Sequence, residues 1–218
     1  MKKHRNLLIA AAVIVAVLVA AWVFGGRYAH SGDGEVAPVP TITAESTPDL
    51  RDRYLTDPVP SGKPTPVEPQ EVVFGDGEFT VTLSVRCDTI LDNMGLLNRN
   101  KHELVPDDGV IFPTTEVIVY EGESVFNVLW REMKRAGIHL EFVNTPIYNS
   151  VYIEGINNLY EFDVGELSGW MYAVNGWYPN YGASRYQLKA GDAVEWNYTC
   201  DLGRDLGQFW LVGGYQGS

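Results

Sequence analysis

The amino-acid sequence predicts an α+β domain in which one helix packs on a mainly antiparallel sheet. Residues 79–87 alternate between apolar and polar side chains, which is typical of a half-buried strand. Residues 124–136 have the apolar spacing of a helix. Several further segments are short and rich in aromatic and β-branched residues, as strands are. The order is strand, strand, helix and then several strands, which indicates an α+β domain.

The expected strands cover residues 79–87, 115–121, 140–145, 151–162, 169–176 and 192–200. The helix is expected to begin after Ser124, which can cap it, and to stop at Gly137. Its apolar stripe comprises Val125, Val128, Leu129 and Met133, widened by Phe126 and Trp130. Asn175-Gly176 is a dipeptide that closes tight hairpin turns, and a second turn is predicted at residues 189–192.

The N-terminal region, residues 1–27, predicts a membrane anchor behind a short basic flank. Residues 7–24 are uncharged and apolar, and as a helix these eighteen residues span roughly 27 Å, about one hydrocarbon core. The basic flank predicts that the N-terminus stays in the cytoplasm and that the rest is exported. A cleaved signal peptide is the alternative, although the apolar run is longer than the usual signal core. The expected location is the cell membrane, with a single pass and an extracellular C-terminal domain.

Residues 28–70 are expected to form a disordered tether. They contain eight of the twelve prolines, with Ser, Thr, Gly and charged residues, and offer little apolar surface to bury. Such a tether can carry a domain through a cell-wall layer, or it can be a flexible linker of no particular length. The folded domain is then expected at residues 71–218.

The net charge argues against nucleic acid as a partner. The chain carries −12 overall, and residues 1–27 contain four basic and no acidic residues, so the remainder carries −16. A surface of this charge repels phosphate backbones.

Cys87 and Cys200 lie in an exported segment, where disulfides are permitted. Both end an apolar face, one on the first strand and one on the last. If these strands are neighbours, the two sulfurs can meet and form a disulfide. Two separate buried thiols are the alternative.

The candidate binding residues are aromatic. Trp170 and Tyr172 share one face of a predicted strand and are either core or ligand-facing. Trp177, Tyr178 and Tyr181 follow the predicted turn, where a partly exposed contact patch is expected. Flat rings with polar tips suit a planar ligand, a sugar or another protein. We call these five side chains the ring cluster.

Metal binding and catalysis have weak support in the sequence. The candidate ligands for a calcium ion, which prefers oxygen, are Asp88, Asp92, Asp201 and Asp205. Their spacing fits no calcium loop, and a solvated acidic rim is the preferred interpretation. No nucleophile elbow, phosphate-binding loop or histidine beside a plausible nucleophile is present, so we expect a protein that is not an enzyme and needs no cofactor.

Several ordered motifs resemble the bacterial transcobalamin-like C-terminal domain family, a domain of unknown function. They are EGESVFNVLW at 121–130, YIEGINNLYEF at 152–162, the run SGWMYAVNGWYPNYGASRYQLKAGDAVEW at 168–196, and YTCDLGRDLG at 198–207. The resemblance implies a β-grasp-like domain similar to the β-domain of transcobalamin and intrinsic factor. In those carriers the β-domain closes over cobalamin held on a larger helical domain, and no repeat of helical pairs occurs in this sequence. Trp170 and Tyr172 match the aromatic strand that faces the corrin ring there.

Two functions follow as hypotheses. The first is a membrane-tethered extracellular binding module for a small planar ligand of the corrinoid type. The second is a surface adhesion or display domain that binds a protein or a glycan.

Overall fold

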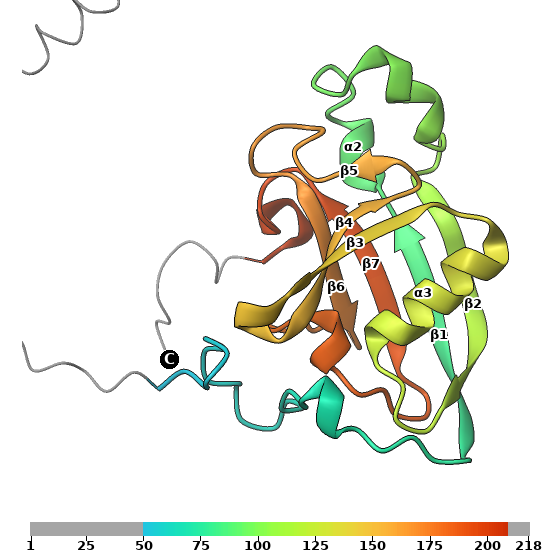
Figure 1. Cartoon of the computed structure of the whole chain (residues 1–218). Coiled ribbons are helices and arrows are strands. Elements are labelled where there is room, and N and C mark those ends of the chain that lie inside the picture. Colours follow the sequence, from blue (N-terminus) through green and yellow to red (C-terminus); the bar gives the residue numbers. More distant parts are fainter. Residues whose placement is uncertain (1–49, 209–218) are drawn as a thin grey trace, which may run out of the picture. The chain divides into compact units, whose positions relative to one another are not determined.

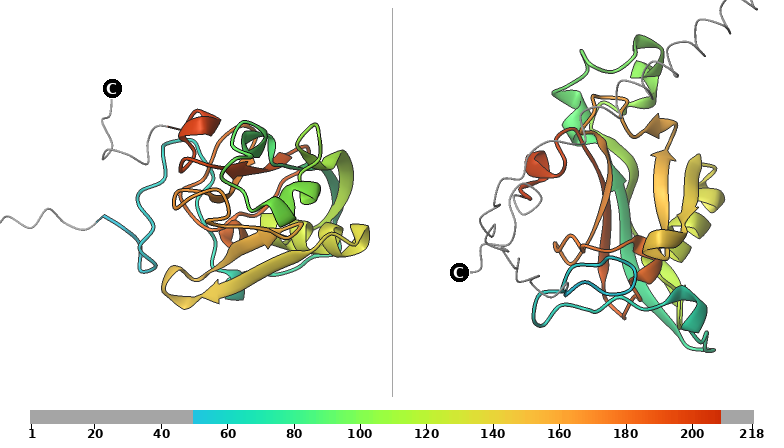
Figure 2. Two further views of the ribbon diagram at one scale, coloured as in Figure 1. Left: turned by 90° about the horizontal axis from the view of Figure 1, so that it is seen from above. Right: turned by 60° about the vertical axis from the view of Figure 1, so that its left-hand side comes forward.

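The computed structural model describes residues 50–208, which form two packed layers around one core. The first layer is a four-stranded sheet in the order β2–β1–β7–β6, and the second is a three-stranded sheet, β3–β4–β5, beside helix α3 (Figures 1 and 2). The α+β class is therefore confirmed, with two sheets where one was expected. The closer description as β-grasp-like stays a prediction. No helix in residues 50–208 is long and apolar enough to cross a membrane, and the predicted anchor lies outside these residues.

Strand β1 (Glu78–Arg86) is one of the two central strands of the four-stranded sheet. It pairs antiparallel with β2 (Val110–Tyr120) and parallel with β7 (Ala193–Thr199), and β6 (Gly169–Val174) pairs antiparallel with β7. The alternation read from the sequence is confirmed, because Val81, Leu83 and Val85 are all buried. The first and last strands are neighbours, and theirs is a parallel pairing in an otherwise antiparallel sheet.

Helix α3 (Val125–Ala136) begins and ends where its caps predict. The Ser124 side chain accepts a hydrogen bond from the Asn127 backbone N–H, and the Asn127 side chain accepts one from the Ser124 backbone N–H. Gly137 ends the helix with a φ of 70°, a conformation that glycine adopts at no steric cost. The buried stripe is confirmed, except that Trp130 is 47% exposed and does not widen it.

The second layer is a three-stranded meander. Strand β3 (Leu140–Thr145) has the predicted bounds, whereas residues 151–162, expected as one strand, contain β4 (Ser150–Ile156) and the short β5 (Leu159–Tyr160). Asn157 and Asn158 turn the chain between them, with φ values of 54° and 59°. Asparagine tolerates this left-handed region better than most residues, so the pair closes a tight turn.

Both predicted turns are confirmed. Asn175 and Gly176 have positive φ values of 53° and 73°, as a primed two-residue turn requires. At the second turn the Asp192 carboxylate accepts the Lys189 backbone N–H at 2.8 Å. The remaining elements are short: α2 (Asp88–Leu91) and the 3-10 turns η1 (Pro69–Glu71), η2 (Arg99–Leu104), η3 (Pro146–Tyr148), η4 (Ala183–Arg185) and η5 (Arg204–Leu206).

Residues 50–70 differ from the expected disordered tether. The Tyr181 hydroxyl donates to the Pro64 carbonyl, and the Val67 backbone N–H donates to the Arg185 carbonyl. Arg185 also donates side-chain hydrogen bonds to Asp52, Thr56 and Glu68. Polar contacts to a few side chains and to the Arg185 backbone hold this segment, and composition alone does not predict such contacts.

The predicted disulfide is absent, and both cysteines are free. The strand register explains why. Arg86 of β1 faces Asn197 of β7. Cys87 directly follows Arg86, whereas Cys200 lies three residues beyond Asn197. Both cysteines directly follow the ends of their strands, and the register extended past these ends offsets them by two residues, or about 8 Å between α-carbons when the spacing between strands is included. That exceeds the reach of a disulfide, which is roughly 7 Å.

Candidate functional site

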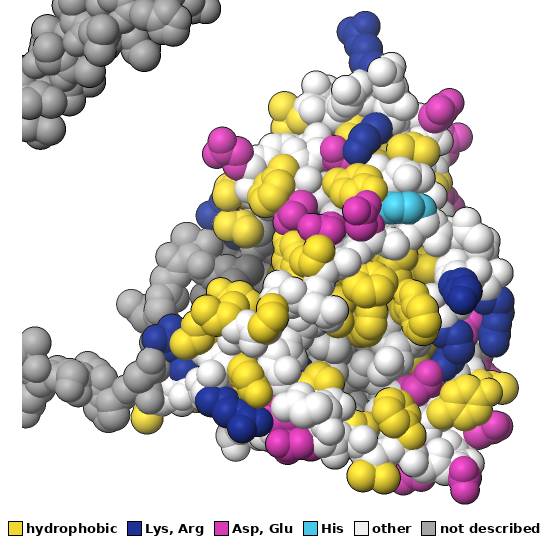
Figure 3. All heavy atoms as spheres, viewed as in Figure 1, with side chains coloured by type: hydrophobic (Ala, Val, Ile, Leu, Met, Phe, Trp, Pro, Cys, Tyr) yellow, Lys and Arg dark blue, Asp and Glu magenta, His cyan; other side chains and the backbone are white. Residues whose placement is uncertain are grey.

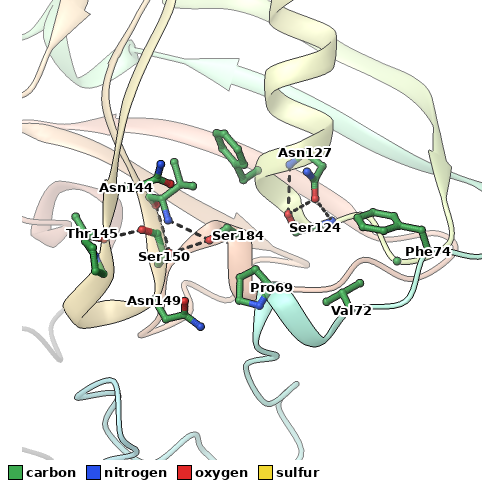
Figure 4. A pocket seen from close by; sticks show the side chains of 14 residues that line it. Pro69, Val72, Phe74, Ser124, Asn127, Asn144, Thr145, Asn149, Ser150 and Ser184 are labelled. Carbon is green, nitrogen blue, oxygen red and sulfur yellow. Dashed lines mark hydrogen bonds between the residues drawn. The ribbon is translucent and has the colours of Figure 1, made fainter.

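The candidate site is a groove with a volume of about 420 Å³ between the N-terminal segment, the start of α3 and the β3–β4 hairpin. Figure 4 shows side chains from these elements and from η4 pointing toward the same space. Its fourteen lining residues are Pro69, Val72, Phe74, Gly122, Ser124, Phe126, Asn127, Asn144, Thr145, Pro146, Asn149, Ser150, Val151 and Ser184.

The hairpin wall of the groove is held by hydroxyl groups. The Thr145 hydroxyl donates to the Ser150 carbonyl at 2.7 Å, and the Ser150 and Ser184 hydroxyls lie 3.1 Å apart. The Ser184 hydroxyl also accepts the Val151 backbone N–H at 3.0 Å. Asn149, at the turn of the hairpin, has a φ of 46° and donates its side-chain amide to Gln70 at 3.0 Å. These bonds join the hairpin to η4 and to the N-terminal segment, so the wall is fixed in place before any ligand arrives.

The opposite wall is apolar and comes from Pro69, Val72 and Phe74. Phe74 is 61% exposed, and across the groove the Phe126 ring packs edge-on against Phe142 with centroids 4.8 Å apart. Gly122 allows residues 73 and 74 to lie close to the chain just before α3. A β-carbon at Gly122 would lie 2.9 Å from the Val73 carbonyl oxygen. Its φ of 94° is also one that side chains rarely adopt.

The groove is neutral. None of the fourteen lining residues, all within the described part of the chain, carries an ionisable side chain. Side-chain amides and hydroxyls face an apolar wall, a combination that fixes the orientation of an uncharged ligand through hydrogen bonds while burying its apolar surface. The lining offers no group that could act as a general acid or base near neutral pH. The arrangement therefore suits binding.

The ring cluster lies elsewhere, mostly in the core. Trp170 and Tyr172 are 9% and 8% exposed, and their polar tips donate to the carbonyls of Leu159 and Tyr181. Tyr178 and Tyr181 are 9% and 6% exposed, so the partly exposed patch expected at these two residues is wrong. Trp177 is half-buried. None of the five lines the groove.

Burial explains the protonation of these tyrosines. It raises the pKa of Tyr172 well above the ordinary value, and the neighbouring Tyr181 and Tyr186 raise it further. Burial also raises the pKa of Tyr178, although a hydrogen bond from Asn197 opposes the shift. Both phenols stay neutral, as core phenols with hydrogen-bond partners do.

The four candidate metal ligands already have other partners or stand apart. Asp88 accepts two hydrogen bonds from Arg86, each of 2.7 Å, and Asp201 forms an ion pair with Arg204. Asp205 accepts hydrogen bonds from Thr199 and from the Cys200 backbone N–H. Asp92 is exposed. Within residues 50–208 no three acidic, cysteine or histidine side chains are grouped to hold a metal ion.

Sequence reasoning missed the groove because its residues come from four separate segments. Ser124 was visible as the start of a helix, and residues 144 and 145 were visible as the end of an expected strand. No local pattern shows that the two face each other. An excess of Ser, Thr and Asn at the ends of elements was the one available signal, and it equally indicates caps and turns.

Part of the chain matches a known family model. Residues 122–200 match the family model described as "Domain of unknown function (DUF4430)". The resemblance read from the sequence is confirmed over these residues. They include α3, most of the hairpin wall and the whole ring cluster, whereas residues 69–74 of the apolar wall precede them. No curated protein matches the chain.

Two solved structures match part of the chain at low similarity. Haptocorrin in complex with Cbi is 19% identical over 58% of this chain and 26% of its own, with a TM-score of 0.43. A proposed metal-binding protein from Ruminococcus gnavus ATCC 29149 is 16% identical over 57% of this chain and 97% of its own, with a TM-score of 0.31. The matched part thus spans about a quarter of the haptocorrin chain.

Proposed function

We propose that the chain is an extracellular, non-catalytic binding module, held at the cell membrane by residues 7–24, and that the groove is its ligand site. The neutral lining of the groove is the observation that carries the proposal. Charged lining residues would favour ions or phosphates, whereas amides, hydroxyls and phenylalanine rings favour an uncharged ligand with both polar and apolar parts. The apolar, uncharged N-terminal run supports the membrane anchor.

A corrinoid is the first candidate ligand. Corrinoids carry amide side chains around a largely planar ring, and amide groups pair well with the side-chain amides of Asn127 and Asn144. A volume of about 420 Å³ accommodates one edge of such a molecule, leaving the rest exposed or covered by a second component. The sequence resemblance to the β-domain of cobalamin carriers supports the same candidate. In this proposal the ring cluster supports the fold and does not touch the ligand.

A surface protein is the second candidate, supported by apolar side chains beside the groove. Val73 is 85% exposed, and Ile147 and Tyr148 at the hairpin turn are 61% and 52% exposed. Figure 3 shows hydrophobic side chains gathered on the face that carries α3, β3 and β4. Exposed apolar groups around a concave surface are typical of interaction sites.

The test is a calorimetric titration of the full-length chain in detergent with cobinamide and with cobalamin. Asn144→Ala should weaken binding about fivefold by removing a hydrogen-bonding group, and Phe74→Ala about tenfold or more by removing apolar contact. Asn100→Ala and Phe162→Ala are the matched controls. Asn100 is exposed, Phe162 is 61% exposed like Phe74, and neither lines the groove.

The absence of a heat signal at millimolar concentrations of both compounds would rule out the corrinoid. Binding that Asn144→Ala and Phe74→Ala leave unchanged would rule out the groove. The second candidate is tested by pull-down from cell-surface extracts with the same four variants. A surface protein is supported only if one partner is captured by the unaltered chain and by the Phe162→Ala variant but not by the Phe74→Ala variant.

A further inference from the structure

Residues 52–68, which we call the strap, close a loop on a single guanidinium group. Arg185 Nη2 donates to Asp52 at 2.7 Å and to Glu68 at 3.1 Å, and Nη1 donates to the Thr56 hydroxyl at 2.6 Å. Asp52 and Glu68 are sixteen residues apart in the chain, yet they meet at the same nitrogen. Arg185 therefore fastens both ends of the strap at once.

Arg185 depends on the strap for its partners. Its side chain is 1% exposed, and each of its side-chain hydrogen bonds goes to the strap. The ring of Tyr54, also in the strap, lies 5.3 Å from the guanidinium carbon. A buried cation without such partners is strongly unfavourable. The domain thus presents a buried positive charge that a segment arriving from upstream neutralises.

The middle of the strap crosses the aromatic turn. The Tyr181 hydroxyl donates to the Pro64 carbonyl at 2.7 Å, and the Lys63 ammonium lies 5.4 Å from the centroid of the Trp177 ring. The Asn180 side-chain amide donates to the Asp57 carbonyl at 3.0 Å. Aromatic side chains that donate hydrogen bonds to the carbonyls of a proline-rich segment are a recurring mode of peptide recognition.

The contact between strap and domain is incomplete, as expected of an exchangeable one. Thr56 is the one residue of the strap that is buried; the other residues between 52 and 68 are half-buried or exposed. Two buried polar atoms at this contact, Arg185 Nε and Asn180 Oδ1, have no hydrogen-bond partner in the described part of the chain. Val59 packs against the hydrophobic core, and the other contacts named here are polar ones that water can replace.

We infer that Arg185, Tyr181 and Trp177 form a binding site for an extended, proline-rich peptide with two spaced carboxylates. In this structure the chain's own residues 52–68 occupy the site. The occupant can leave, and the vacated site then takes the same class of peptide from solution. This inference does not depend on the ligand of the groove, because none of these three residues lines the groove.

The experiment detaches the strap in the full-length chain with the double variant Thr56→Val/Glu68→Gln. Trypsin then cuts after Arg53, whose side chain is 61% exposed. Losing one hydrogen bond and one negative charge that oppose a buried cation should speed this cleavage at least tenfold. A fluorescent peptide of residues 50–70 should bind the double variant at least tenfold more tightly than it binds the unaltered chain. Thr65→Val/Glu78→Gln is the matched control, since both residues are exposed and neither contacts Arg185.

Each outcome decides the inference. Unchanged cleavage would overturn it, because Arg185 would then not be what holds the strap. Faster cleavage without peptide binding would also overturn it, since the strap would be an ordinary part of the domain. If the double variant loses its circular dichroism signal, Tyr181→Phe replaces it. That variant keeps the ring and loses one hydrogen bond, and cleavage should become about twofold to tenfold faster; no change there would equally overturn the inference.

Discussion

Cys87 and Cys200 show how a single residue acquires its role from the register of a sheet. Alternation correctly placed both at the ends of apolar strand faces, and their strands are neighbours. The two-residue offset between the strands decides that the sulfurs do not bond, and this offset is set by pairing partners more than a hundred residues apart. Burial raises the pKa of the Cys87 thiol to about 12, and burial also raises that of Cys200.

We expect the chain to contain two free thiols. Unfolded without a reducing agent, it should react with two equivalents of Ellman's reagent, and Cys200→Ser should reduce this to one. The folded chain should react at Cys200 alone and slowly, because Cys87 is fully buried and both thiols resist ionisation. Zero equivalents from the unfolded chain would show a disulfide and contradict the register.

Among the elements, the helix and the strap illustrate opposite degrees of predictability. The signals for α3 are local: a capping serine, an apolar stripe and a terminal glycine lie within fourteen residues. The strap has no apolar periodicity, and its composition is that of a disordered linker. Its order comes from contacts with Asn180, Tyr181 and Arg185, more than a hundred residues downstream, and no pattern in either segment indicates the other.

The strap should respond to acid through Asp52. Burial would raise the pKa of this carboxyl, but hydrogen bonds from Arg185 and from the backbone N–H groups of Thr56 and Tyr54 outweigh it and lower the value to about 2. A lowered pKa stabilises the folded state above the ordinary value of 3.8, and this contribution disappears as the pH falls toward 2. Urea unfolding between pH 6 and pH 2 should therefore show that the free energy of unfolding falls more steeply below pH 4 in the unaltered chain than in Asp52→Asn. Asp57→Asn, at an exposed carboxylate of the same segment, should follow the unaltered chain; identical profiles for all three would contradict the assignment.

At the scale of the molecule, residues 50–208 are organised around β1, which pairs with both β2 and β7 in the four-stranded sheet. Its inward side chains share one hydrophobic core with α3 and β4, so both layers depend on the same strand. The groove and the strap site lie on elements that this core positions. Neither site has a core of its own, so loss of the core would abolish both.

Leu83→Ala should destabilise the domain by about 2–5 kcal/mol, because Leu83 is fully buried and its truncation leaves a cavity. Ile118→Ala, at a half-exposed position of β2, should cost less than about 1 kcal/mol. Urea unfolding followed by circular dichroism measures both. If the two variants lose similar amounts of free energy of unfolding, β1 is not central to the core.

The sequence by itself determined the α+β class, the caps of α3, both turns and the position of most strands. Each of these depends on side chains within a few residues of one another, where backbone preference and periodicity act directly. The tertiary structure alone decided that the ring cluster is mostly core, that the cysteines stay apart, and that the groove and the strap site exist. These features bring together side chains from distant segments, and their distances follow from strand register and layer packing, which local sequence does not encode.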